Sequence, residues 1–94
     1  MKDFLGVGTV VLLKGAEHEL MIIGFFPQVD VNGEKKIFDY LACHFPEGLV
    51  DSERTVAFNK EDIEKVTYES YSDDDNKLFL KKLSEIEEQV KKGG

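Results

Sequence analysis

The stretch Lys36-Ile37-Phe38-Asp39-Tyr40-Leu41-Ala42-Cys43-His44-Phe45-Pro46-Glu47-Gly48 decides the fold. Its alternate positions are apolar or aromatic on both sides: one side carries Ile37, Leu41, Cys43 and Phe45, and the other carries Phe38, Tyr40 and Ala42. Successive strand residues point to opposite faces of a sheet, so this pattern predicts a strand that protein covers on both faces. We therefore expect a central strand here, and Pro46 ends it because proline cannot donate a ladder hydrogen bond.

Two β-branched and aliphatic runs precede this stretch, at residues 9–14 and 19–26. Their length and composition predict the two arms of a hairpin. Gly24, alone within the second run, predicts a bulge or a bend in that arm. The pair Asn32-Gly33 favours a tight hairpin turn because both residues tolerate positive φ. We expect this turn to lead the chain into the central strand.

The elements after the central strand are short. Residues 47–54 are polar and without periodicity, which predicts an exposed loop, whereas 55–58 and 66–71 have strand patterns. Asn59 is a suitable helix N-cap. Asp62 lies three residues later, where its side chain can accept a hydrogen bond from the backbone N–H of the cap residue. We therefore predict an α+β fold: a small antiparallel five-stranded curved sheet or an SH3-like barrel, with a one-turn helix before the last strand.

The C-terminal part of the chain, residues 73–92, predicts an amphipathic helix that follows a β-rich core at 5–71 within a single domain spanning 1–94. Ser72 is a suitable N-cap, and the carboxylates that follow it suit the positive end of the helix dipole. Apolar residues then recur at spacings of four, three and four, which is the period of one helix face. This stripe comprises Phe79, Leu83, Ile86 and Val90.

The helix stripe allows two interpretations. It can pack on the open end of the sheet, or part of it can stay exposed to bind a partner helix. Phe25 and Phe26 raise the same question, because adjacent strand residues face opposite sides and one ring should then be core and the other surface. The candidate protein-binding residues are Phe25, Phe26, Asp73, Asp74, Asp75, Phe79 and Leu83.

Charge and length limit the classes of partner. The 19 acids exceed the 12 bases, giving a formal net charge of −7. Such a surface repels phosphate backbones and anionic lipid headgroups, so we expect neither nucleic acid nor a membrane as partner, and a basic protein fits better. The longest apolar run, 20–26, is far shorter than the roughly 20 residues of a spanning helix, and no signal peptide is evident. We expect a cytoplasmic protein.

Residues that can carry chemistry are few and scattered. Cys43 and His44 are adjacent, but neighbouring strand residues diverge, so they cannot exchange a proton as a dyad. Asp39 lies among aromatic residues and must reach solvent or find partners; it is an acid-base candidate or, as we favour, a hydrogen-bond acceptor for a loop backbone or a tyrosine hydroxyl. The single cysteine and the isolated His18 and His44 provide no zinc-ligand spacing. We expect no cofactor, no metal and no enzyme activity.

Several blocks of the sequence, taken in order, resemble a bacterial family. They are Gly8-Thr9-Val10-Val11-Leu12-Leu13-Lys14-Gly15, Leu20-Met21-Ile22-Ile23-Gly24, Phe38-Asp39-Tyr40, Phe45-Pro46-Glu47-Gly48 and Phe58-Asn59-Lys60-Glu61-Asp62-Ile63. On these blocks the chain resembles the domain-of-unknown-function family DUF4176, from about residue 5 to residue 83. The family tends to have glycine where this chain has Ser70, which puts the local turn in question.

The resemblance implies a role, because members of that family occur in Gram-positive bacteria beside genes for type VII secretion and its LXG-type toxins. It implies a non-enzymatic accessory protein: a chaperone or targeting adaptor for a secreted toxin. An immunity protein that covers a toxin active site with its acidic face is an alternative. A small enzyme that uses Asp39 or His44 is a further one. The sequence leaves the partner and the oligomeric state open.

Overall fold

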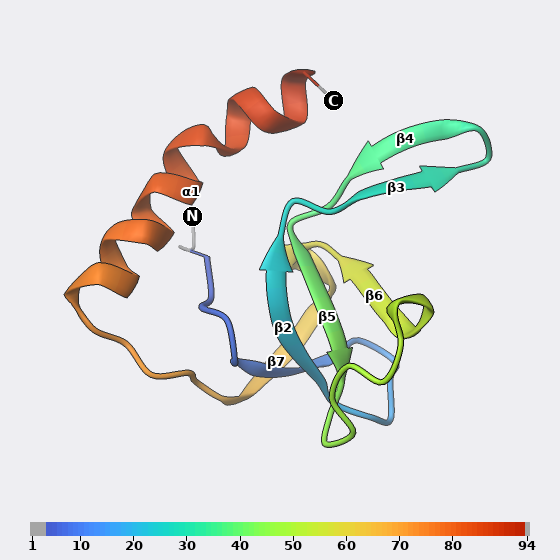
Figure 1. The fold of residues 1–94 in the computed structure, drawn as a ribbon, viewed down its shortest axis with the longest axis vertical. Coiled ribbons are helices and arrows are strands. Elements are labelled where there is room, and N and C mark those ends of the chain that lie inside the picture. The colour runs from blue at the N-terminus through green and yellow to red at the C-terminus, as the bar shows by residue number, and fades with distance from the viewer. Residues whose placement is uncertain (1–3, 94) are drawn as a thin grey trace.

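The computed structural model describes residues 4–93, with seven β-strands, two single 3-10 turns and one α-helix (Figure 1). The elements in chain order are β1 (Val10–Leu13), β2 (Leu20–Phe25), β3 (Gln28–Val31), β4 (Glu34–Ile37), β5 (Tyr40–His44), the 3-10 turn η1 (Ser52–Arg54), β6 (Thr55–Phe58), the 3-10 turn η2 (Lys60–Asp62), β7 (Ile63–Tyr68) and α1 (Asp74–Gly93). Within these residues, no helix is both long enough and apolar enough to cross a membrane.

Five antiparallel strands form the main sheet in the order β6-β5-β2-β1-β7, and β3 and β4 form a separate two-stranded sheet. The predicted α+β class is confirmed, as is the curved five-stranded sheet. The barrel alternative is wrong: among the described residues β6 and β7 do not pair with each other, so the sheet stays open between its two terminal strands. Figure 1 shows the β3–β4 hairpin projecting away from this sheet.

The expected central strand is two strands with a break between them. β5 is interior, with Tyr40 and Ala42 buried, but Phe38 and Asp39 separate it from β4. The break lies opposite Phe26, whose φ of 54° departs from the strand conformation, and Asp39 there donates its backbone N–H to Asn59 Oδ1 at 3.0 Å and accepts the Lys60 N–H at Oδ2 at 2.8 Å. Backbone bonds continue across the break, because the Phe26 N–H donates to the Asp39 carbonyl at 3.2 Å and the Phe38 N–H donates to the Pro27 carbonyl at 3.1 Å.

The Asn-Gly turn and the bend at Gly24 are both confirmed. Asn32 and Gly33 have φ of 53° and 84°, and they join β3 to β4 in a hairpin that is separate from β5 and not part of one central strand as expected. The β2–β5 ladder changes register between Ile22 and Gly24, as expected for a bulge. The hairpin therefore extends the β2–β5 pair beyond the main sheet.

The predicted single turn before the last strand is confirmed as the 3-10 turn η2. Asn59 precedes it, and the Asn59 N–H donates to Asp62 Oδ2 at 2.9 Å. β7 begins at Ile63, three residues earlier than expected, directly after this turn. At the helix, the cap is Asp73 and not Ser72, because Asp73 Oδ1 accepts the Asn76 N–H at 2.8 Å.

The core lies between the inner face of the main sheet, the N-terminal segment and α1. Figure 1 shows the N-terminal segment running between α1 and the sheet. Phe4 in this segment is only 2% exposed, and its ring packs edge-on against three others, with centroid distances of 5.9 Å to Phe25, 5.3 Å to Phe26 and 5.5 Å to Tyr40. The Phe4 ring therefore packs the N-terminal segment onto the face of the sheet that is turned toward α1.

Candidate protein-binding site

Fewer residues of α1 pack on the core than its apolar stripe predicts. Leu83 is 6% exposed and is the one buried residue among those of α1 whose side chains the structure describes. Around it, the half-buried helix residues are Asn76, Leu80, Ser84, Glu87 and Val90. Phe79 and Ile86 belong to the predicted stripe, yet they are 49% and 42% exposed. The stripe is therefore divided, with one side packed on the core and the other side open.

We call the open side the helix flank, defined as Phe79 and Ile86 of α1 together with Phe25 of β2. The Phe25 and Phe79 rings meet edge to face with centroids 5.8 Å apart. Phe79 and Ile86 are seven residues, or two helical turns, apart, so they stand roughly 10 Å apart on one line along α1. The helix flank is thus a row of apolar side chains that begins at the sheet and continues along the helix.

A partly buried ion pair sets the orientation of α1. Lys60 Nζ lies 3.1 Å from Glu87 Oε1, and the two side chains are 15% and 22% exposed. The same ammonium group lies 3.9 Å from the centroid of the Phe4 ring, within the range of a cation–π contact. A charge pair at this depth gives little net stability, but breaking it is costly, so it favours one rotation of the helix over others.

The candidate protein-binding residues differ in their burial and in their contacts. Phe25 and Phe26 are both half-buried, so the expectation of one core and one surface ring is wrong: Phe26 has a φ of 54°, which interrupts the strand alternation and lets both rings reach Phe4. Asp73 caps the helix, and Asp74 and Asp75 are exposed in its first turn.

Phe79 remains open to a partner, whereas Leu83 is covered by the protein itself. Ile86 belongs to the predicted stripe but not to the predicted binding residues, and its 42% exposure adds it to the candidate surface. Lys60 was not recognised either, because nothing near it in sequence indicates the ion pair with Glu87.

The residues considered for catalysis do not form a site. Asp39 is buried and accepts the Lys60 backbone N–H, which confirms the favoured reading of this carboxylate as an acceptor for a loop backbone. Cys43 is buried and His44 is exposed. Among residues 4–93, no group of three His, Cys, Asp or Glu side chains comes together in a way that could hold a metal ion.

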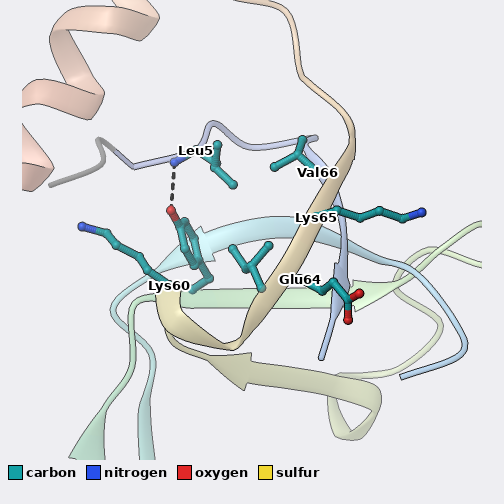
Figure 2. A pocket seen from close by; sticks show the side chains of 7 residues that line it. Leu5, Lys60, Glu64, Lys65 and Val66 are labelled. Carbon is teal, nitrogen blue, oxygen red and sulfur yellow. Dashed lines mark hydrogen bonds between the residues drawn. The ribbon is translucent and has the colours of Figure 1, made fainter. Parts of the chain in front are cut away.

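An open hollow of about 390 Å³ lies between the N-terminal segment, η2 and β7 (Figure 2). Its lining residues are Leu5, Tyr40, Lys60, Ile63, Glu64, Lys65 and Val66. The Tyr40 hydroxyl accepts the Leu5 N–H at 2.9 Å, the bond drawn in Figure 2. Figure 2 also shows Lys60 and Lys65 extending to opposite sides, which leaves the middle of the hollow apolar.

Burial raises the pKa of Tyr40 from 10.0 to about 12; the hydrogen bond from Leu5 lowers it in part, and the charges of Asp39 and Glu87 raise it further. The folded state thus favours the neutral hydroxyl. In the unfolded chain the hydroxyl ionises near pH 10, so its contribution to stability is complete below that pH and is lost as the pH rises toward 12.

We expect the tyrosinate absorbance of the wild type minus that of Tyr40→Phe to titrate with a midpoint near pH 12. The wild type should also lose more unfolding free energy than Tyr40→Phe between pH 10 and pH 12. A difference titration centred near pH 10 would show that Tyr40 is solvated and would contradict the packing described here.

The fold and the candidate site define a small α+β domain with an open curved sheet and an apolar flank on its C-terminal helix. The family model described as Domain of unknown function (DUF4176) matches residues 4–79, and the chain belongs to this family. No curated protein and no solved structure matches the chain. The Ser70 backbone N–H donates to the Thr9 hydroxyl at 3.2 Å, so the segment after β7 is tied to the residue that precedes β1.

Proposed function

We propose that this protein is a non-enzymatic protein-binding accessory factor that uses its helix flank to hold a partner. The observation that carries the proposal is the exposure of Phe79 and Ile86, at seven-residue spacing, on a helix whose other side is fixed by Leu83 and the Lys60–Glu87 pair. Exposed apolar side chains aligned along a helix mark a protein interaction surface, and this spacing fits a second helix.

The partner we propose is an LXG-type toxin exported by type VII secretion, for which the protein would act as a chaperone or targeting adaptor in the cytoplasm of a Gram-positive bacterium. The chain belongs to DUF4176, and the proposal takes up what the resemblance to that family implies, a place beside such toxin genes. The net charge of −7 supports a partner with a basic surface, because opposite charge raises the association rate and disfavours other acidic proteins.

An immunity protein is the second candidate, and the acidic composition favours it, since an immunity protein must cover a toxin active site. The two roles differ in the part of the toxin that is bound. An adaptor binds the export domain and leaves the toxin domain active. An immunity protein binds the toxin domain and protects the cell from it.

Co-expression with the two halves of the neighbouring toxin separates these roles. We expect the tagged protein to co-purify with the export domain and not with the toxin domain, and deletion of its gene to abolish toxin export. Rescue of cells that express the toxin domain alone would establish the immunity role instead. Normal folding and export of the toxin in the deletion strain would contradict the adaptor proposal.

A further inference from the structure

A second hollow, of about 410 Å³, lies on the face of the main sheet that is turned away from the core. Val10 and Met21 line it, and these two residues are partners in the β1–β2 ladder. Their neighbours Val11, Leu20 and Ile22 belong to the core. Because successive strand residues point to opposite faces, Val10 and Met21 point away from the core, and we call the space above them the outer hollow.

Aromatic side chains border the outer hollow on two sides. Tyr68 of β7 is the ladder partner of Val10 and is 61% exposed. Phe45, which follows β5, is 41% exposed and lies on the other side of β1 and β2. The floor between them is apolar, with Val10 buried and Met21 half-buried. The outer hollow thus has an apolar floor and a ring at each side.

Glu19 supplies the charge. It is the one ionisable acid or base among the described residues that line the outer hollow. The Phe45 N–H donates to the Glu19 carbonyl at 3.1 Å, so the two residues lie opposite each other on neighbouring chain segments and their side chains share a face. The Glu19 side chain is half-buried, and within the described part of the chain its carboxylate forms neither an ion pair nor a hydrogen bond.

This combination of groups matches an arginine side chain. A guanidinium group can donate two hydrogen bonds to a carboxylate and stack its plane on an aromatic ring, which Glu19 and Phe45 together allow. The alkyl part of arginine can cover the apolar floor. Lysine fits less well, because its ammonium group is more strongly hydrated and has no plane to stack. The net charge of −7 also favours a basic partner.

We infer that the outer hollow binds an arginine side chain of a partner protein, with the guanidinium paired to Glu19 and stacked on Phe45. Leu83 of α1 belongs to the core, on the opposite face of the sheet, so this site is separate from the helix flank. The inference therefore goes beyond the proposed function and does not depend on it.

The probe is acetyl-Gly-Arg-Gly-amide, titrated into the full ¹⁵N-labelled chain in about 0.15 M salt, which screens distant charges. We expect amide shifts at Val10, Met21, Phe45 and Tyr68, with a dissociation constant of about 10 mM or tighter. The citrulline peptide has nearly the same shape but no charge, and it should bind at least roughly fivefold more weakly.

Three results of this titration would overturn the inference. One is the absence of shifts at these amides at about 50 mM peptide. Another is equal binding of the citrulline peptide, which would show that apolar contact alone holds the ligand. The third is a shift of the same amides on dilution of the free protein, which would show that a second copy of the chain occupies the outer hollow.

A pair of matched variants tests the role of the carboxylate. Glu19→Gln keeps the size of the side chain and should weaken binding of the arginine peptide at least roughly fivefold. Glu17→Gln removes the same charge from an exposed position outside the lining and should change the affinity by less than about twofold. Equal effects of the two substitutions would show that net charge alone attracts the peptide and would overturn the site.

The role of the ring is tested by Phe45→Leu, which keeps an apolar side chain but removes the aromatic face. The variant should bind the arginine peptide roughly two- to fivefold more weakly and bind the citrulline peptide nearly as well as the wild type does. Unchanged affinity for the arginine peptide would contradict the stacking of the guanidinium on Phe45.

Discussion

Phe4→Ala is expected to destabilise the protein by about 3–5 kcal/mol, the usual cost of truncating a buried phenylalanine. A domain of this size has roughly 5–15 kcal/mol of stability in total, so this loss removes a large fraction of it. Phe4 is 2% exposed and packs against Phe25, Phe26 and Tyr40, so its removal leaves a cavity shared by three rings.

The measurement is thermal and urea unfolding of Phe4→Ala beside Val7→Ala. Val7 lies in the same N-terminal segment and is 54% exposed, so its truncation should change the unfolding free energy by less than about 0.5 kcal/mol. We expect the melting temperature of Phe4→Ala to fall by roughly 15 °C or more. A loss no larger than that of Val7→Ala would show that the N-terminal segment does not hold the core.

The regular elements could be predicted from local patterns. Strand composition, the Asn32-Gly33 turn and the helix period each depend on residues that are close in sequence. For this reason the β1–β2 hairpin, the turn η2 and the C-terminal helix all lie near their expected places. The class of fold followed from the order of these elements.

The misplaced features depend on partners that are distant in sequence. The buried Asp39 carboxylate accepts the Lys60 N–H, 21 residues later, and the rotation of α1 depends on the Lys60–Glu87 pair, whose residues are 27 apart. The importance of Phe4 arises from rings on β2 and β5. Periodicity identifies an apolar stripe on a helix, but it cannot say which part of the stripe the rest of the chain covers.

The second large effect is expected on partner binding. Ile86→Glu places a carboxylate in the helix flank, where a bound partner helix would have to bury it. Loss of a hot-spot residue costs about 2 kcal/mol or more, and a carboxylate buried at the Ile86 position should cost at least as much, so the affinity should fall at least roughly thirtyfold. Ile86 is 42% exposed in the free protein, so the stability should change little.

Leu78→Glu is the matched control. It introduces the same charge on α1, and Leu78 is 55% exposed but lies eight residues before Ile86, about 80° away around the helix, outside the helix flank. Because the two variants have the same net charge, a difference between them reports the position of the carboxylate and not the overall electrostatic attraction.

The most direct test of the role proposed for the helix flank is the affinity of the proposed partner, the export domain of an LXG-type toxin, for the wild type, Ile86→Glu and Leu78→Glu, measured by titration calorimetry on folded protein. We expect Ile86→Glu to bind at least roughly thirtyfold more weakly than the wild type, while Leu78→Glu stays within about threefold of it. Equal affinity of all three proteins would contradict the claim that the helix flank holds the partner.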